Sequence, residues 1–427
     1  MDKRKLETIL TDQAEELALK NDIRFCQRKE EDLIDLESPQ AQVVIGVRRS
    51  GKSTLCYNAL KRSGVTFAYV NFDDERLFAL TADDLNDVLE VLYKIYGDFK
   101  HLFIDEIQNI TEWYLFVNRL LRRGMHIVLT GSNAKLLSGE LATHLTGRHH
   151  NITLYPFSFS EYCDAKGVDV SSQSTLAIGA RRAAFDEYMH RGGFPELLFI
   201  KSEKDYITTL VNNILQRDIE HRFHVVYTSA FEQMAHHLLN IAPAVVADKT
   251  LQETFGLKSQ HTAKNYVSYL KQAFLLVGLT KYSAKSRLRM TGSKVYPIDV
   301  ALMNNREDAF AGVNLGWRLE AIVYLHLLRE YKSQGLDIYY SSDRSGECDF
   351  LVCNGQKTLM AVQVSYDLSG DRVRKRELDG LLLAARKTGC DNLLLLTDHE
   401  YADIEHSGHR VRVRPVYDYV LTSDNLL

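Results

Sequence analysis

The sequence has no apolar run of about 20 residues, the length that a bilayer-spanning helix requires, so we expect no membrane segment. It also has no C-x-x-C pair. Its six cysteines are scattered, which favours reduced thiols in a cytosol over a disulfide framework or a zinc site. The start, Met1–Glu7, mixes charges and lacks an apolar core, so we predict no export signal and a cytoplasmic location.

Acidic residues are missing from one stretch of the chain. Between Lys258 and Lys294 there is no Asp or Glu, although the net charge of the whole chain is −4. The same stretch contains eight basic residues. A local field of one sign is typical of a surface that meets a phosphate backbone, and a solvated basic face is the alternative. The eight are Lys258, Lys264, Lys271, Lys281, Lys285, Arg287, Arg289 and Lys294.

A glycine loop near the start of the chain is the strongest motif. Residues 46–53 read Gly-Val-Arg-Arg-Ser-Gly-Lys-Ser and fit the phosphate-loop pattern G-x-x-x-x-G-K-[ST] at every fixed position. Val43–Ile45 before it is typical of a buried strand, and Thr54–Leu60 after it of a helix. A chance match in a glycine turn is the alternative, but the flanking pattern favours ATP or GTP binding. The predicted phosphate contacts are Gly46, Arg48, Arg49, Ser50, Gly51, Lys52, Ser53 and Thr54.

Two carboxylates further along the chain complete this site. A strand over Val65–Phe72 and a helix capped near Thr81 precede the apolar run Leu102–Ile104, which ends in Asp105 and Glu106. We predict that Ser53 and Asp105 hold Mg²⁺, that Lys52 reaches the β- and γ-phosphates, and that Glu106 polarises the attacking water.

Two more candidates follow the next strand, Ile127–Leu129. Ser132 or Asn133 would lie beside the γ-phosphate; a simple helix cap is the alternative for either residue. Arg148 precedes a strand over Ile152–Leu154 and would reach the nucleotide of a neighbouring subunit, or would be an ordinary surface arginine.

These motifs together resemble a known family. Five segments occur in a characteristic order: Gly46–Ser53, Asn71–Asp74, Phe103–Gln108, Thr130–Ser132 and Leu145–Arg148. The last is followed by Tyr155-Pro156-Phe157-Ser158-Phe159. They resemble AAA+ ATP-binding proteins of bacteria and archaea that carry a C-terminal domain of unknown function related to PD-(D/E)XK nucleases.

The resemblance implies an ATPase core followed by a helical lid. It also implies ATP rather than GTP, and the chain has no guanine-reading N-K-x-D element after the core. Arg148 becomes an expected arginine finger acting in trans, which implies a homo-oligomer. Gly193-Phe194-Pro195 resembles the G-x-P element that contacts adenine, so Pro195 is a further candidate; a plain Gly-Pro helix start is the alternative.

The middle of the chain predicts a winged helix. The sequence indicates three helices, over Ala230–Asn240, Lys249–Phe255 and Gln260–Gln272. The last two are joined by a turn at Gly256 and predict a helix-turn-helix. Strands near Phe274–Tyr282 and Lys294–Tyr296 would flank a basic wing. We predict DNA binding, non-specific or led by DNA shape; a packing module between domains is the alternative. The DNA-binding candidates are Lys258, His261, Lys264, Lys285, Arg287 and Arg289.

The C-terminal part resembles a PD-(D/E)XK nuclease without its full catalyst. Glu320 on a helix over 315–324 and Asp349 on a strand over 346–352 match metal-binding carboxylates of that family. The next strand reads Ala361-Val362-Gln363-Val364-Ser365, so Gln363 stands where a carboxylate belongs and Ser365 where the lysine belongs. Lys375 or Arg376 on the following helix are candidate substitutes for that lysine. We expect a nuclease-like fold that is catalytically degenerate.

The length of 427 residues exceeds what one core usually reaches, about 250–300 residues, so we expect several domains. We predict an α/β protein in four parts: an AAA+ P-loop core (1–160), a helical lid (161–227), a winged helix (228–305) and a nuclease-like α/β domain (306–427). The leading hypothesis is an ATPase that couples nucleotide state to its grip on duplex or branched DNA. The alternatives are a slow nucleotide-dependent switch that recruits a protein partner, and an active ATP-coupled, Mg²⁺-dependent nuclease.

Overall fold

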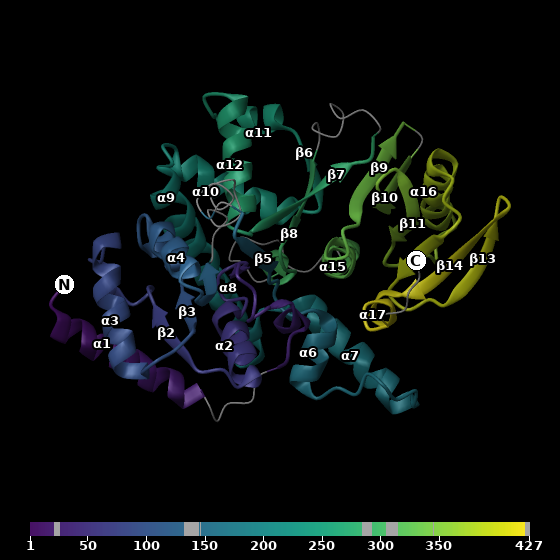
Figure 1. Cartoon of the computed structure of the whole chain (residues 1–427). Helices are drawn as coiled ribbons and strands as arrows, with labels where there is room; N and C mark the ends of the chain where they lie inside the picture. Colours follow the sequence, from purple (N-terminus) through teal and green to yellow (C-terminus); the bar gives the residue numbers. More distant parts are fainter. Residues whose placement is uncertain are drawn as a thin grey trace. The chain divides into compact units, whose positions relative to one another are not determined.

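The computed structural model describes residues 1–20, 26–131, 145, 147–283, 293–304, 315–344 and 346–422, and they divide into two compact units (Figure 1). The first unit comprises Met1–Pro156 with Gln272–Phe274, and the second comprises Phe157–Lys271 with Leu275–Leu427. The predicted boundaries near residues 160, 227 and 305 stay predictions. Among the described helices, none is long and apolar enough to cross a membrane.

The first unit is built on a parallel sheet. Within the described residues, five strands lie side by side in the order β2-β3-β4-β1-β5 (Figure 1). Such strands are covered on both faces, which explains the continuous apolar runs that predicted them. Because β4 separates β1 from β3, residues at the end of β4 lie between the ends of the other two strands. The strands are β1 (Ala41–Ile45), β2 (Phe67–Asn71), β3 (His101–Asp105), β4 (His126–Gly131) and β5 (His149–Thr153).

Helices pack against this sheet through apolar faces. Leu55 and Leu60 of α2 (Lys52–Ser63) pack with Val44, Phe103 and Val128, which share one face of the sheet. The helix α1 (Lys3–Leu19) lies alongside α3 (Leu85–Tyr96) (Figure 1). The other elements are α4 (Trp113–Arg122) and the short helices η2 (Lys29–Leu33), η3 (Glu75–Leu77), η4 (Ala82–Asp84) and η5 (Ile107–Asn109).

The alternating strands and helices predicted for this unit are confirmed. The capping box predicted at Thr81 and Asp84 is also present, and it opens η4 ahead of α3. The helix α1 was not predicted from the sequence.

The second unit begins with helices. Ser158 and Glu161 form a capping box at the start of α6 (Phe159–Lys166), and α7 (Thr175–Arg191) follows. A short helix, η7 (Pro195–Leu198), begins at Pro195. The next helix is α8 (Glu203–Asn213), whose acidic first turn, with Glu203 and Asp205, favours a helix start at that point. It continues into a π-helical turn, η8 (Ile214–Glu220), and α9 (His221–Phe223).

The middle segment has the predicted three helices. They are α10 (Thr228–Ile241), α11 (Asp248–Thr254) and α12 (Gln260–Gln272). Gly256 has φ 61°, a left-handed conformation suited to the turn before α12. The expected apolar stripe of α12, formed by Val267 and Leu270, is buried. The segment also contains three antiparallel strands, in which β8 (Ser293–Pro297) pairs with both β6 (Ala244–Val246) and β7 (Leu276–Lys281). The sequence did not indicate β6.

These strands continue into those of the C-terminal segment. Across the described ranges, nine strands form one sheet in the order β13-β14-β12-β11-β10-β9-β7-β8-β6, which we call the long sheet. The junction is parallel pairing of β7 with β9, where Thr280 lies opposite Tyr339. The strands added here are β9 (Asp337–Asp343), β10 (Gly346–Asn354), β11 (Lys357–Val364), β12 (Leu393–Thr397), β13 (Ala402–His406) and β14 (His409–Pro415).

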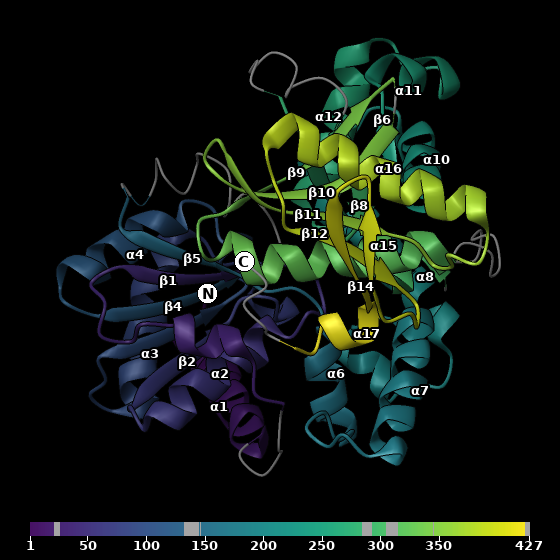
Figure 2. The same cartoon turned by 90° about the vertical axis from the view of Figure 1, so that its right-hand side faces the viewer.

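Helices cover both faces of the long sheet. Leu351 and Leu395 pack under α16 (Asp371–Thr388), whereas Phe350 and Leu394 pack with α15 (Leu315–Leu327) on the other face (Figure 2). This division follows from the alternation of side chains along a strand. The C-terminal helices and strands predicted from the sequence are thus present; β13, β14 and α17 (Val416–Tyr419) were not predicted. Two short elements, α14 (Ala301–Asn304) and η9 (Leu328–Lys332), complete the unit.

Candidate nucleotide site

The phosphate loop connects β1 to α2 and needs glycine at its first position. A Cβ on Gly46 would lie 2.1 Å from the carbonyl oxygen of Leu154, so no larger residue fits beside the end of β5. Gly51, with φ 95°, caps the start of α2. The free backbone N–H groups of this first helical turn provide donors for an anion.

Lys52 and Ser53 lie in the first turn of α2. The Lys52 side chain is buried; its Nζ donates to the carbonyl oxygen of Val47 at 3.2 Å and lies 3.9 Å from Oε1 of Glu106. The Ser53 hydroxyl donates to Oδ1 of Asp105 at 2.9 Å. The structure therefore brings the predicted Ser53–Asp105 pair into direct contact, although β1 and β3 are not neighbours in the sheet.

Asp105 ends β3 and is surrounded by hydroxyl groups. Thr130, at the end of β4, donates to its Oδ1, and the phenol of Tyr69 donates to its Oδ2 at 3.4 Å. Burial raises the pKa of Asp105, and the charge of Glu106 raises it further. Because this setting disfavours the ionised form of Asp105, a cation bound beside the carboxylate would stabilise that form. The sequence missed Thr130 and Tyr69; the signal for Thr130 was a hydroxyl residue closing an apolar strand.

Glu106 directly follows the strand in a left-handed conformation, with φ 51°. Its backbone N–H donates to the hydroxyl of Thr130 at 3.0 Å. Its Oε2 accepts a hydrogen bond from the side-chain amide of Gln108. The carboxylate is thus held between Gln108 and Lys52, and the sequence did not indicate the role of Gln108.

The remaining loop residues have distinct surroundings. The guanidinium of Arg48 lies 3.8 Å from Oδ2 of Asp73, beyond the end of β2. Arg49 is exposed, with φ 69°. The Ser50 hydroxyl is buried, and no group among the described residues forms a hydrogen bond with it. Thr54 is half-buried in α2.

The ligands expected for Mg²⁺-ATP fit these surroundings. Ser53 and Asp105 present oxygen donors, which Mg²⁺ prefers. The buried Ser50 hydroxyl, which has no hydrogen-bond partner among the described residues, is a further polar group that a bound phosphate could satisfy.

The remaining nucleotide candidates lie outside the loop and the acid pair. Arg148 is exposed just before β5, and its carbonyl oxygen accepts a hydrogen bond from the backbone N–H of Ala41 at 3.0 Å. Ser132 and Asn133 lie outside the described residues. Pro195 belongs to the second unit, where it opens η7 and is half-buried.

The glycines before Pro195 meet a buried aspartate. The backbone N–H of Gly193 donates to Oδ2 of Asp299 at 2.9 Å, and Oδ1 of the same residue accepts from the N–H of Ala301 at 2.9 Å. A Cβ on Gly192 would lie 1.9 Å from Oδ1 of Asp299. The Gly-Gly pair therefore has a packing role within the second unit.

The predicted DNA-binding residues divide into two groups. Lys258, His261 and Lys264 are exposed at the start of α12 and just before it. Lys285, Arg287 and Arg289 lie outside the described residues. Two other lysines of the basic stretch are engaged within the protein. Lys271 donates to the hydroxyl of Ser293 at 3.1 Å, and Lys294 is buried.

The nuclease-like positions gather around β10 and β11. Oδ2 of Asp349 accepts from the N–H of Val364 at 2.9 Å. Gln363 accepts from the N–H of Asp349 at 3.2 Å and donates to Glu377 at 2.7 Å. The Ser365 hydroxyl donates to the carbonyl oxygen of Asp367 at 3.1 Å.

Glu320 lies in the same region, on α15. Its Oε1 accepts from the hydroxyl of Tyr296 at 2.7 Å. Of the two candidate substitutes for the missing lysine, Lys375 is exposed and Arg376 pairs with Glu377. Among the described residues, no group of three or more His, Cys, Asp or Glu side chains is arranged to hold a metal ion.

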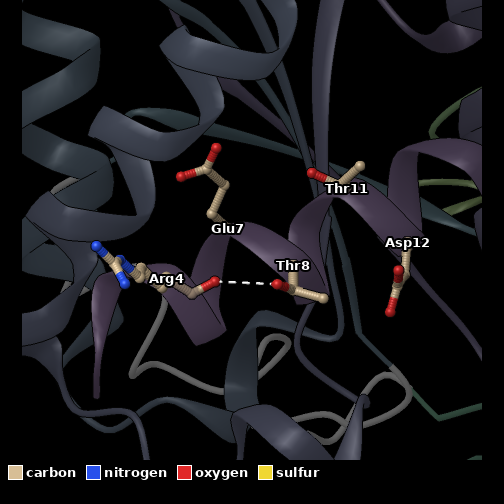
Figure 3. Close-up of a pocket in the computed structure, with 5 residues that line it drawn as sticks. All are labelled: Arg4, Glu7, Thr8, Thr11 and Asp12. Carbon is tan, nitrogen blue, oxygen red and sulfur yellow. Dashed lines mark hydrogen bonds between the residues drawn. The ribbon is translucent and has the colours of Figure 1, made fainter.

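A surface hollow of about 390 Å³ lies elsewhere in the first unit, along α1 (Figure 3). Its polar groups are largely used within the protein: Asp12 pairs with Arg76 at 2.6 Å, and Glu7 accepts from Lys94 at 2.6 Å. Figure 3 shows the hydroxyl of Thr8 donating to the carbonyl oxygen of Arg4. The hollow has none of the nucleotide-site residues. Its lining consists of Arg4, Glu7, Thr8, Thr11 and Asp12.

Comparisons with known proteins agree with the site. A family model described as an AAA domain matches residues 38–163, and a model for a domain of unknown function (DUF8612) matches residues 182–312. The parallel sheet, the phosphate loop and the Ser53–Asp105 pair, together with the first match, define an AAA-type P-loop ATPase domain.

Two curated proteins match nearly the whole chain. An uncharacterized protein of Methanocaldococcus jannaschii is 31% identical over 404 residues, covering 91% of this chain and 90% of that protein. An uncharacterized protein of Haemophilus influenzae is 31% identical over 399 residues, covering 89% and 94% respectively. The chain belongs to the same family as these two proteins.

Solved structures are more distant. The Walker-type ATPase PABY2304 of Pyrococcus abyssi aligns with a TM-score of 0.43 and 14% identity, covering 65% of this chain and 95% of that chain. The RuvB Holliday junction branch migration motor of Thermotoga maritima aligns with a TM-score of 0.27 and 16% identity, covering 62% and 87%. The assignment to a class therefore rests on the site and on the AAA domain match.

Proposed function

We propose that this protein binds and hydrolyses ATP at the Gly46–Ser53 loop and uses its nucleotide state to control how the second unit holds DNA. The observation that carries the ATPase part is the contact of Ser53 with Asp105, with Glu106 beside Lys52. It places a pair of oxygen donors, a cation and a candidate base in one partly buried cluster. Phosphoryl transfer to water requires little more than these groups, held in position.

Each residue has a separate task in this proposal. Ser53 and Asp105 would hold Mg²⁺, which neutralises phosphate charge when bound. Lys52 binds the phosphates once its contact with the carbonyl oxygen of Val47 is exchanged for them. Glu106 accepts a proton from the attacking water. Thr130 positions both acids through its one hydroxyl.

A slow nucleotide-dependent switch is the second candidate, and one contact favours it. Gln108 donates to the same carboxylate that must receive the proton of the attacking water. While this bond persists, Glu106 is a weaker base, so turnover waits for its release. A DNA or protein partner that withdraws Gln108 would then set the rate.

Exposed basic residues support the DNA part of the proposal. Lys258, His261 and Lys264 are exposed around the start of α12, and α12 follows α11 in sequence after the Gly256 turn, which is compatible with the predicted helix-turn-helix. With no acidic residue between Lys258 and Lys294, this surface attracts phosphates without reading bases. The exposed Arg148 would act in a neighbouring subunit of a homo-oligomer.

The decisive experiment measures ATP hydrolysis by the full chain with and without single-stranded, duplex and branched DNA. Wild type is compared with Glu106→Gln, which should bind ATP normally and stop hydrolysis. Stimulation by DNA supports the DNA-coupled ATPase, and slow, unstimulated turnover with retained nucleotide supports the switch. Normal hydrolysis by Glu106→Gln would refute the assigned base.

We do not propose an active nuclease. Gln363 uses both ends of its amide within the protein, and Ser365 donates to a neighbouring carbonyl group. Mg²⁺-dependent cleavage of DNA by the purified chain, abolished by Asp349→Ala, would overturn this conclusion.

A further inference from the structure

A buried lysine lies among the acidic residues of the nuclease-like region. Lys294 is on β8 and only 7% exposed. Its Nζ lies 2.7 Å from Oε1 of Glu320, 2.8 Å from Oε1 of Glu347 and 4.0 Å from Oδ1 of Asp349. We call these four residues the acid cluster. They come from three elements, because Glu320 is on α15 whereas Glu347 and Asp349 are on β10.

The cluster favours a charged lysine. Burial opposes the charge on Lys294, but the carboxylates of Glu320, Asp349 and Glu347 outweigh that cost and raise the pKa of the ammonium group. Tyr296, two residues further along β8, donates its hydroxyl to the same oxygen of Glu320. One strand thus supplies both a cation and a hydrogen-bond donor to this carboxylate.

We propose that Lys294 is the resident cation of the acid cluster, and that the cluster is an ion-pair latch between β8, α15 and β10 rather than a site for a divalent metal. Direct contacts at 2.7 and 2.8 Å leave the ammonium between two carboxylates. The amide of Gln363 is occupied by Asp349 N–H and Glu377, so its carbonyl oxygen is not offered to a metal.

The latch has a mechanical consequence because the chain continues from the end of β8, at Pro297, to Asp299. That residue accepts from the N–H of Gly193, which lies between α7 and η7, and packs against Gly192. The stretch from Lys294 to Asp299 therefore contacts α15 and β10 through Lys294, and it contacts the backbone of Gly193 through Asp299. If the segment around Gly193 moves, we expect these contacts to transmit the movement to α15 and β10.

The test compares thermal unfolding of the full chain, without nucleotide, for wild type and Lys294→Met. Removing one partner of a buried ion pair leaves uncompensated charge, so we expect Tm to fall by roughly 10 °C. Lys357→Met, an exposed lysine on β11, is the matched control and should leave Tm within about 1 °C. Adding Glu320→Gln to Lys294→Met should recover part of the loss, because it removes the stranded carboxylate.

Mn²⁺ separates the latch from a metal site. Millimolar Mn²⁺ should raise Tm of Lys294→Met more than that of wild type, since the vacated carboxylates then accept a cation. An unchanged Tm in Lys294→Met would overturn the proposal. So would Mn²⁺-dependent DNA cleavage by wild type that Lys294→Met abolishes, because Lys294 would then serve catalysis.

A second measurement covers the case in which Lys294→Met does not fold. Wild type and Asp349→Asn are titrated with Mn²⁺ and the bound metal is counted by electron paramagnetic resonance. Equal binding by the two proteins supports the latch. Loss of one bound Mn²⁺ in Asp349→Asn overturns it.

Discussion

The hydroxyl of Thr130, at the end of β4, donates to the carboxylate of Asp105, at the end of β3. The same hydroxyl accepts the backbone N–H of Glu106. One small side chain thus fixes the directions of both acids. It can do so because β4 lies between the strand that leads to the phosphate loop and the strand that carries the acids.

Replacing Thr130 tests this positioning role. Thr130→Val keeps the shape of the side chain but removes the hydroxyl, so the orientation of Glu106 is lost. We expect kcat for ATP hydrolysis to fall by about 10–100-fold with ATP affinity changed less than about threefold. Steady-state kinetics and nucleotide titration measure the two quantities. Thr130→Ser should retain near-normal kcat; an equal loss in both variants would contradict the argument.

The glycine at the start of the phosphate loop gives a second prediction. In Gly46→Ala the new methyl group would lie 2.1 Å from the carbonyl oxygen of Leu154, so the backbone must shift. We expect ATP affinity to fall at least about tenfold and the free energy of unfolding to drop by about 1–3 kcal/mol. The control is Gly179→Ala in α7, where a Cβ meets nothing within 4 Å. That variant should be more stable by about 0.5–1 kcal/mol, because alanine favours a helix.

Mixing two inactive variants tests whether Arg148 acts in trans. Arg148→Ala should lower kcat by at least about 100-fold if the guanidinium stabilises charge on the transferred phosphoryl group. Lys52→Ala should lose ATP binding but keep its own Arg148. A mixture of the two proteins should hydrolyse ATP faster than either alone. A mixture as inactive as its components, under conditions where the subunits exchange, would argue against a finger from a neighbour.

The proposed DNA surface predicts a change in salt dependence. Lys258→Ala combined with Lys264→Ala removes two exposed charges near α12. The slope of log affinity against log salt concentration should become shallower by about 2, since each phosphate contact contributes about 0.9. Fluorescence anisotropy with duplex DNA at several salt concentrations measures the slope. Lys357→Ala serves as the control, and an unchanged slope in the double variant would count against this surface.

Asp299 predicts a pH dependence of stability. Burial raises the pKa of Asp299 to about 6 from its ordinary 3.8. The folded chain therefore retains a proton that the unfolded chain releases as the pH rises from about 4 to 6. The stability that this proton contributes is present at low pH and is lost as the pH rises through 6.

The difference in pKa corresponds to about 3 kcal/mol between pH 4 and pH 6. Denaturant unfolding of wild type and Asp299→Asn at several pH values measures it. Across this range wild type should lose stability relative to the variant. Parallel pH profiles would show that Asp299 titrates normally.

Much of the nucleotide site was predictable from sequence. The loop at Gly46–Ser53 and the acids Asp105 and Glu106 follow apolar strands, and the carboxyl ends of parallel strands meet at one edge of a sheet. Thr130 and Gln108 were not predicted, because their roles depend on how side chains from different elements face one another. The local sequence offers at most a hydroxyl residue at the end of an apolar strand for Thr130, and it does not show which side chains that hydroxyl contacts.

Lys294 shows a different limit. In the sequence it is one more positive charge in a basic stretch, and it contributes to the prediction of a DNA-binding surface. Its burial follows from the pairing of β8 with β7 and of β7 with β9, which brings β8 next to residues from another part of the chain. Long-range strand pairing of this kind leaves no local pattern.

The long sheet has a practical consequence for anyone who divides this chain. A fragment that starts at residue 306 would lack β7, the neighbour of β9, and would expose a row of unpaired backbone groups along a new edge. Such an edge invites pairing between copies, so we expect the fragment to aggregate rather than to behave as an independent module. The same reasoning applies to gene fusions and natural recombination: a break at this point would separate two halves of one folded layer.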